Sequence, residues 1–438
     1  IDLNHPQLIN WKSYSSLIQK LVAGANATEG ESKQSIASVG GASAEIGFSD
    51  LVGQMFAPLE RFSKVQFVPF TAIAILIALY ILCIGPLDYF LLRRLFGRME
   101  LTWITFPLFS ILFCGIAWGI STWTRPTKLQ ANQLEIIDVD AVSGRCRGSV
   151  WVNLYSPFGH NLDVEFGKHA LGFEPDESVL SWHALPGDRM GGMNLRSGRN
   201  VSMPEYRQAV GRSSMDAESS GSEVHVDLKE FPVQVSSSRA LFGSWNSSFS
   251  GVGKNGIRSN LVFEQKSQSI AGTLKNPFDF ELTNCRVYHG NWAYQLDAPL
   301  GPGEPLNLRS ESSERPLRAM LNRLEVEEET DDNNRNHRSQ SKRWEVSEIN
   351  ISRIAEMMMF YDAAGGKGYT GLTHGYQSFV DFSEPLHLNR AILIGEVVQQ
   401  GADLKIASDG KPVDHEIDQV TTIVRVLLPV KVESKKRR

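Results

Sequence analysis

Two long runs without a charged residue constrain this chain more than any other feature. One covers residues 65–87 and the other residues 101–124, and both consist mainly of aliphatic, aromatic and small residues. About 20 apolar residues are enough for a helix to cross the hydrocarbon of a bilayer. Paired uncharged runs of this length are rare in soluble folds, where the alternative is two buried core helices. The sequence therefore predicts a two-helix transmembrane hairpin over 65–124, with the lipid bilayer as a partner.

The charges beside the two runs predict how the hairpin is oriented. Its turn carries Arg93, Arg94 and Arg98 against one glutamate, whereas the outer flanks are balanced in charge. Arginine and lysine close to membrane helices favour the cytoplasmic side. We therefore expect a cytoplasmic turn, and we expect both 1–64 and 125–438 on the exoplasmic side. In a bacterial inner membrane that side is the periplasm.

A distinctive motif covers the end of the first run and the start of the second. Its residues are Gly85, Pro86, Asp88, Tyr89, Arg93, Arg94, Trp103 and Pro107. The motif resembles that of a group of bacterial two-helix membrane proteins, and the resemblance extends over residues 50–160. Members of that group often carry a soluble domain before the hairpin, and some are encoded beside export-type transporters. The resemblance implies a large β-rich exoplasmic region and other membrane or envelope proteins as partners, but no reaction.

The residue types in this motif have physical consequences of their own. Pro86 removes a backbone donor and bends a helix, while Gly85 allows another backbone to approach closely. Asp88 is costly near a membrane unless it is paired, and Arg93 or Arg94 is within reach across a tight turn. Such an ion pair sets the depth of the hairpin, or it forms part of a docking site for a partner's transmembrane helices. The sequence leaves both interpretations open.

The segment before the hairpin shows helical spacing twice. Residues 8–22 and 48–62 each place apolar residues on one face, and Ser49 is a candidate N-cap for the second helix. Between them, residues 23–47 are rich in Gly, Ala and Ser and are typical of a flexible linker. We expect residues 1–64 to be the end of an upstream soluble domain together with these amphipathic helices.

After the second run the apolar pattern changes to a period of two residues, which is typical of strands. The expected strands are 134–142, 150–155, 224–228, 232–236, 260–264, 269–274, 280–289 and 292–296. Short strands at this spacing favour an antiparallel sandwich. Phrases between 272 and 303 resemble immunoglobulin-like modules of bacterial surface proteins. The sequence therefore predicts a β-rich exoplasmic domain over 125–310.

The rest of the chain divides into three expected parts. Residues 311–345 include a polar, highly charged stretch and are predicted to be a disordered linker or loop. Residues 346–434 are predicted to form a helix over 349–364 and closing strands over 403–407 and 421–432, the last of which completes a sheet begun earlier. The end, 435–438, is a basic tail. The fold class expected for the whole chain is a membrane-anchored α+β protein with a mainly antiparallel, sandwich-like exoplasmic part.

Several possible reactive or ligand-binding patterns fail on inspection. The glycine-rich stretch Gly365–Gly371 lacks the Ser or Thr that follows Lys in a phosphate-binding loop. His160, His169 and His183 match no compact metal-ligand spacing and are expected to be surface or capping residues. Asp138 and Asp140 alternate on one strand face, which favours a solvated face. We therefore expect no cofactor and no metal.

The cysteines divide into two pairs by location. Cys83 and Cys114 lie in the apolar runs and are expected to be packing residues. Cys146 and Cys285 fall in the β-rich part, where an exoplasmic location permits a disulfide between them. The sequence leaves the bridged and the free states open.

A net charge of −5 gives the chain no general attraction for nucleic acid. The large exoplasmic surface, the anchor and the lack of a reactive constellation favour a non-catalytic envelope module that binds another protein or a polymer. Such a module could be an accessory subunit of a transport or secretion complex. The alternative is a membrane-anchored hydrolase whose site lies upstream of Ile1 or is assembled from residues far apart in the sequence.

Overall fold

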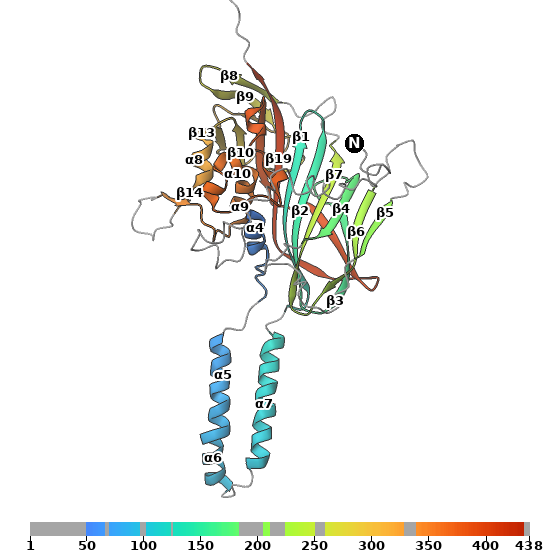
Figure 1. Ribbon diagram of the computed structural model, residues 1–438, viewed down its shortest axis with the longest axis vertical. Helices are drawn as coiled ribbons and strands as arrows, with labels where there is room; N and C mark the ends of the chain where they lie inside the picture. Colours follow the sequence, from blue (N-terminus) through green and yellow to red (C-terminus); the bar gives the residue numbers. More distant parts are fainter. Residues whose placement is uncertain are drawn as a thin grey trace, which may run out of the picture.

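The computed structural model describes residues 50–65, 70–96, 102–123, 126–183, 205–210, 224–249, 259–327 and 339–432. In this part of the chain, two long helices extend from a mostly β domain (Figure 1). The expected helix over 8–22, the linker over 23–47 and the basic tail over 435–438 lie outside the described residues.

The helices are α4 (Leu51–Leu59), α5 (Phe70–Leu82), α6 (Asp88–Leu91), α7 (Thr102–Trp123), α8 (Leu317–Asn322), α9 (Ile351–Met359), α10 (Tyr361–Ala364) and α11 (Lys367–Thr370). Shorter helical turns are η1 (Cys83–Leu87), η2 (Leu92–Phe96), η5 (Ser378–Val380) and η6 (Pro385–His387). The strands are β1 (Leu129–Asp140), β2 (Arg145–Ser156), β3 (His160–His169), β4 (Glu177–Trp182), β5 (Glu205–Val210), β6 (Val224–Val233), β7 (Ser237–Ser248), β8 (Ser259–Glu264), β9 (Ser269–Lys275), β10 (Thr283–His289), β11 (Trp292–Leu296), β12 (Pro305–Asn307), β13 (Ser312–Pro316), β14 (Arg323–Glu327), β15 (Ser339–Arg343), β16 (Arg390–Val397), β17 (Ala402–Ser408), β18 (Lys411–Pro412) and β19 (His415–Val432).

All of these strands except β14 and β15, which form a separate pair, belong to one mixed sheet with β19 near its centre. β19 pairs in parallel with β1 and antiparallel with β16, while β1, β2, β7 and β4 follow one another in antiparallel pairs. Parallel pairing also occurs between β8 and β19 and between β4 and β6. The expectation that the last strand completes a sheet begun earlier is confirmed. The segments 125–310 and 346–434 therefore contribute strands to one sheet.

Apolar residues pack on both faces of the central strands. On β2, Val150, Val152 and Leu154 belong to one core, and Trp151 points to the other face and belongs to a second core. The first core is lined mainly by strands, and helices α4 and α9 cover the second. The alternation expected for this strand is confirmed, and neither face of it is left to solvent.

The helix expected over 48–62 is α4, and it packs into the second core. Leu51, Met55 and Leu59 are fully buried. Its N-cap is Asp50 in place of the expected Ser49, because the Asp50 carboxylate accepts a hydrogen bond from the Val52 amide at 3.1 Å. Asp50 also accepts a hydrogen bond from the Gly375 amide at 2.7 Å. These contacts join α4 to the C-terminal part of the same folded unit.

The helix expected over 349–364 is present as α9 and α10, separated by Phe360. Gly365 and Gly366 end it with positive φ angles of 121° and 59°, which L side chains rarely adopt. The expected linker over 311–345 is different in its described parts. There β13 pairs with β11, α8 buries Leu317 and Leu321, and β14 pairs with β15. Apolar positions just before the charged stretch tie this segment to the second core.

Helices α5 and α7 lie side by side and extend away from the β domain (Figure 1). Tyr80 joins them, with its hydroxyl 3.2 Å from the Ser110 hydroxyl and its ring edge-on to Phe113. Residues Phe70–Arg94 and Thr102–Ile120 form helices long and apolar enough to cross a membrane. None of the most apolar 18 residues of either helix is buried, so these are not core helices of the β domain.

Candidate ligand-binding cleft and hairpin motif

The residues of the hairpin motif lie at the end of the hairpin far from the β domain (Figure 1). Gly85 and Pro86 fall in the π-helical turn η1, through which the helix continues past the proline. Apart from the adjoining backbone of its own helix, no atom of the described residues lies within 4 Å of the position that a Cβ on Gly85 would occupy. On α7, Pro107 lies inside the helix and Trp103 is 87% exposed. The motif therefore presents most of its residues outward.

The structure contradicts the expected ion pair of Asp88 with Arg93 or Arg94. Arg93 donates a hydrogen bond to the Tyr89 hydroxyl at 2.8 Å, and its guanidinium lies 5.9 Å from the centre of that ring. The reason is helical spacing, since residues four apart share a face. Asp88 is only 2% exposed, and its Oδ1 atom has no hydrogen-bond partner among the described residues. Arg94 is exposed.

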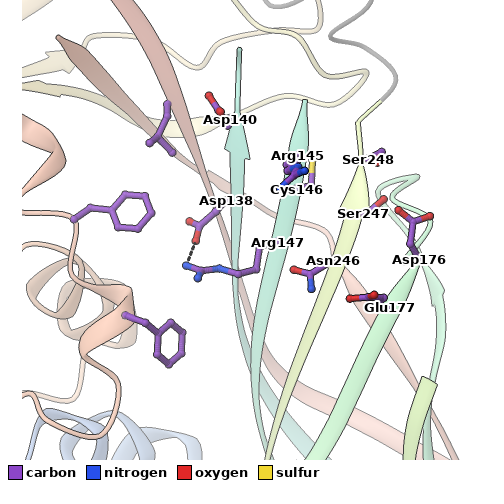
Figure 2. Close-up of a pocket in the computed structure, with 13 residues that line it drawn as sticks. Asp138, Asp140, Arg145, Cys146, Arg147, Asp176, Glu177, Asn246, Ser247 and Ser248 are labelled. Carbon is purple, nitrogen blue, oxygen red and sulfur yellow. Dashed lines mark hydrogen bonds and ion pairs between the residues drawn. The ribbon is translucent and has the colours of Figure 1, made fainter. Parts of the chain in front are cut away.

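A cleft opens on the helix-facing side of the sheet, at the point where the residues on this face of the strands change from apolar to polar. On β1, Leu134 and Ile136 belong to the second core, and Asp138 follows on the same face. The cleft has a volume of about 1070 Å³ and lies over β1, β2, β7 and β4 (Figure 2). Its position follows from the covering helices, which extend over only part of this face.

A row of polar side chains crosses five strands at the cleft. The residue pairs in register are Arg425 with Asp138, Asp138 with Arg147, Arg147 with Asn246, and Asn246 with Glu177. We call these five residues the polar ladder. In Figure 2 it runs from Asp138 through Arg147 and Asn246 to Glu177. Acidic, basic and amide groups are thus placed side by side on a face that is otherwise apolar.

The inner end of the polar ladder is buried and fully paired. Arg425 is 1% exposed and donates to both carboxylate oxygens of Asp138, at 2.6 and 3.0 Å. Its guanidinium also donates to the Val380 carbonyl at 2.6 Å and lies 3.8 Å from the centre of the Phe382 ring. Arg147 bonds the same carboxylate at 2.8 Å. The expectation that Asp138 belongs to a solvated face is therefore wrong, because two arginines compensate its burial.

Asp140 lies at the rim of the cleft. Burial raises the pKa of its carboxyl, but hydrogen bonds from Ser143 and the Val142 amide, together with the charge of Arg390, outweigh that effect and lower the pKa overall. Asp140 and Arg390 are 3.4 Å apart. This acid is thus ionised and locally satisfied.

The outer end of the polar ladder is open. Arg145, Asn246 and Glu177 are exposed, and within the described ranges their side chains make no hydrogen bond or ion pair. Phe379 forms the opposite wall, is 40% exposed and lies 5.4 Å below the Arg147 guanidinium. The sequence analysis missed these residues. On β2, Arg145 and Arg147 alternate with Cys146 and Gly148. This alternation was the signal in the sequence that could have indicated a polar face at this end of the strand.

The cysteines of the β domain are free. Cys146 lines the cleft but is only 3% exposed, and Cys285 is 1% exposed. Burial raises the pKa of each thiol to about 12. Of the two states left open by the sequence, the structure has the unbridged one, and neither thiol is a reactive nucleophile in this state.

His169 belongs to a buried network and is not the surface or capping residue expected from the sequence. Its Nε2 atom lies 3.0 Å from Oε1 of Glu135, which also accepts a hydrogen bond from the Trp245 indole at 2.9 Å. The Ala402 amide donates to the other carboxylate oxygen at 2.7 Å. The carboxylate of Glu135 is thus satisfied by three donors and joins β1, β3, β7 and β17.

A serine and a histidine meet beside a second cavity of about 540 Å³. The Ser178 hydroxyl lies 2.7 Å from Nδ1 of His225, the contact that an activated nucleophile needs. However, Ser178 is only 2% exposed, and the two residues are direct neighbours on β4 and β6. We interpret the contact as a cross-strand hydrogen bond, because a substrate carbonyl has no open approach to the hydroxyl.

No family model matches this chain, and no curated protein matches it. Two solved structures of the yeast delta-COP-I mu-homology domain are similar over 70% of this chain and 99% of theirs. One, complexed with a Dsl1 WxWxV peptide, has 5% identity and a TM-score of 0.27, and the other has 7% identity and a TM-score of 0.24. Similarity this low carries no argument about fold or function.

Proposed function

We propose that this protein is a membrane-anchored binding module of a bacterial envelope, with its β domain on the periplasmic side of the inner membrane. The observation that carries the proposal is the pair of projecting helices, whose apolar side chains are exposed. Ile75 is 60% and Ile111 71% exposed. Exposure of this much apolar surface to water is unfavourable, whereas lipid accepts it without cost.

The ends of the hairpin support the proposed topology. Before α5, Lys64 pairs with Glu416 at 2.6 Å, and after α7, Lys128 pairs with Asp414 at 2.7 Å. Both ends are therefore held near the start of β19, on one side of the proposed membrane. The exposed Arg93 lies at the opposite end of the hairpin. By the positive-inside rule that end is cytoplasmic, which assigns the β domain to the periplasm.

The cleft supports a binding role. It combines an open row of polar side chains with an aromatic wall. Two groups in the cleft could in principle react, but the Cys146 thiol is buried and the Asp138 carboxylate is paired with arginine. Binding sites typically combine an apolar surface with a few placed polar groups. We further propose that the hairpin motif contacts helices of a transport or secretion complex, for which this protein is an accessory.

Topology can be tested with single cysteines in intact cells. Ser143→Cys lies on the exposed turn between β1 and β2, and Gly97→Cys lies in the sequence between the two helices. A membrane-impermeant maleimide should label the first variant and not the second. Cys146 and Cys285 serve as internal controls, because burial and a raised thiol pKa keep them unreactive. Labelling of Gly97→Cys alone would invert the topology, and recovery of the protein in the soluble fraction would refute the anchor.

The accessory role can be tested by affinity capture of the full chain in mild detergent. Asp88→Ala and Arg94→Ala should each weaken the capture of a specific membrane partner. Asp279→Ala, which changes an exposed acid on the β domain, is the matched control. If no specific partner accompanies the unmodified protein, the accessory role is refuted.

A further inference from the structure

The open end of the polar ladder offers donors and acceptors in a fixed order. Arg147 donates, Asn246 both donates and accepts, and Glu177 accepts. These residues lie in register on β2, β7 and β4. Neighbouring strands are about 4.8 Å apart, so the row spans roughly 10 Å. A ligand that matches this row must itself both donate and accept hydrogen bonds at several adjacent points.

The charges around the cleft exclude a strongly charged polymer as the best match. Asp176 and Glu177 lie at one side, and Arg145 and Arg147 lie across from them (Figure 2). Beyond the arginines, the cleft is also lined by Asp138 and Asp140, but each of these acids is paired with an arginine. A polyanion meets Asp176 and Glu177 and a polycation meets the two arginines, and like charges brought together across an interface are unfavourable. A neutral ligand avoids both penalties. Hydroxyl groups fit best, since each one donates and accepts.

The aromatic wall adds a second requirement. Phe379 is 40% exposed towards the cleft and has the Arg147 guanidinium 5.4 Å from its ring centre. Its segment, η5, is fastened to the polar ladder by the hydrogen bond from Arg425 to the Val380 carbonyl. An aromatic ring presents an apolar surface to C–H groups. The ligand should therefore carry an apolar face next to its hydroxyls, as a pyranose ring does.

The backbone and the inner end of the site are held in place before any ligand binds. Its polar groups stand on paired strands, and the buried Arg425–Asp138 pair fixes Arg147 from behind. Preformed sites lose little conformational entropy on binding, which favours affinity. The volume of about 1070 Å³ is at the upper end of ligand sites and leaves room for several linked rings.

We propose that this cleft binds a neutral oligosaccharide segment of a glycan. Asn246 donates hydrogen bonds to ring hydroxyls and accepts hydrogen bonds from them, and Glu177 accepts from a hydroxyl. Arg147 donates to a further oxygen, and Phe379 contacts the apolar face of a ring. The inference rests on the proposed function as a binding module and names its ligand class. It is independent of the membrane topology.

The test uses the full chain in lipid nanodiscs and isothermal titration calorimetry. Sugar-headed detergents are avoided because they carry the chemistry under test. The probes are maltohexaose, cellohexaose and N-acetylated chitohexaose, and the charged comparators are hexagalacturonate, hexalysine and hexaglutamate. At least one neutral hexasaccharide should bind saturably and more tightly than every comparator.

Three variants locate the binding. Glu177→Ala, Asn246→Ala and Phe379→Ala should each weaken the affinity for that hexasaccharide about tenfold, the effect of one lost hydrogen bond or ring contact. Glu281→Ala, an exposed acid outside the cleft, should change it less than twofold. Glu177→Gln, which keeps the shape, replaces Glu177→Ala if the latter loses its near-ultraviolet circular dichroism.

Several results would overturn the inference. They are failure of all three neutral hexasaccharides to bind, equal binding by the cleft variants and the wild type, and tighter binding of a charged comparator. Tighter binding of a charged comparator would agree with the proposed function as a binding module but would show that the ligand belongs to a different class. Soluble behaviour in the cysteine-labelling experiment would instead overturn the anchor and leave this inference untouched.

Discussion

The two halves of the helix-facing side of the sheet use the same strands in opposite ways. In the apolar half, Ile136 and Trp151 pack under α4 and α9. In the polar half, Asp138 and Arg147 stand on the same faces of β1 and β2 and line an open cleft. The change takes place within two residues on β1 and within four residues on β2. It shows that the covering helices, and not the strands, decide which part of the face is core and which part is site.

The largest expected effect is on the apolar half. Trp151 is fully buried, and its ring centre lies 5.5 Å from that of Phe242. Trp151→Ala should lower the free energy of unfolding by about 3–5 kcal/mol because it leaves a large cavity. Urea unfolding followed by circular dichroism measures the change. Trp118→Ala, which changes a 72% exposed residue of α7, should leave the unfolding of the β domain as it was.

The next effect concerns the buried pair at the boundary of the two halves. Arg425→Met should lower the free energy of unfolding by about 3 kcal/mol, since it leaves Asp138 with one partner in place of two. The double variant Asp138→Leu/Arg425→Met should lose less than the sum of the two single changes. Additive losses in the same urea titrations would show that the two side chains are not energetically coupled.

A pH effect should come from the apolar half. His183 stacks on Phe56, and burial lowers the pKa of its imidazole from 6.5 to about 4. Between these values the unfolded chain binds a proton that the folded chain does not, so stability falls as the pH drops from 7 to 4. The loss is on the order of 2 kcal/mol. His183→Gln should flatten this dependence in thermal unfolding, and an unchanged slope would show that another group causes it.

The smallest effect on stability should come from the open end of the polar half. Glu177→Gln changes an exposed side chain that has no partner among the described residues, so the free energy of unfolding should change by less than about 0.5 kcal/mol. A larger loss would mean that Glu177 supports the fold. Glu177 would then belong to the core part of this face and not to the site.

Much of the fold could be predicted from the sequence because its signals are local. The apolar runs over 65–87 and 101–124 correspond to two long exposed helices, and most of the period-two stretches correspond to strands. The expected strands 224–228 and 232–236 are an exception, since both belong to β6, which ends at Val233. The glycines at 365 and 366 end a helix as expected, since their positive φ angles are a local requirement. Each of these features depends on neighbours within a few residues.

The candidate site could not be predicted, because its residues meet only through long-range pairing. Asp138 alternates with apolar residues as a solvated residue does, and only the parallel pairing of β1 with β19 places Arg425 beside it. The same holds for Asn246 and Glu177, which no local pattern joins. Helix α4 was expected to belong to an upstream domain for a similar reason, since nothing near it in the sequence reveals its contact with α9.

The position of β19 has a consequence for how the chain reaches its folded state. This strand lies between β1 and β16, and its Arg425 meets a partner 287 residues earlier in the chain. During synthesis, β1 must therefore wait with an unpaired edge until β19 has left the ribosome. A nonsense mutation shortly before residue 415 would remove a strand from the middle of the sheet and leave β1 and β16 each with an unpaired edge. We expect such a product to misfold and to be degraded.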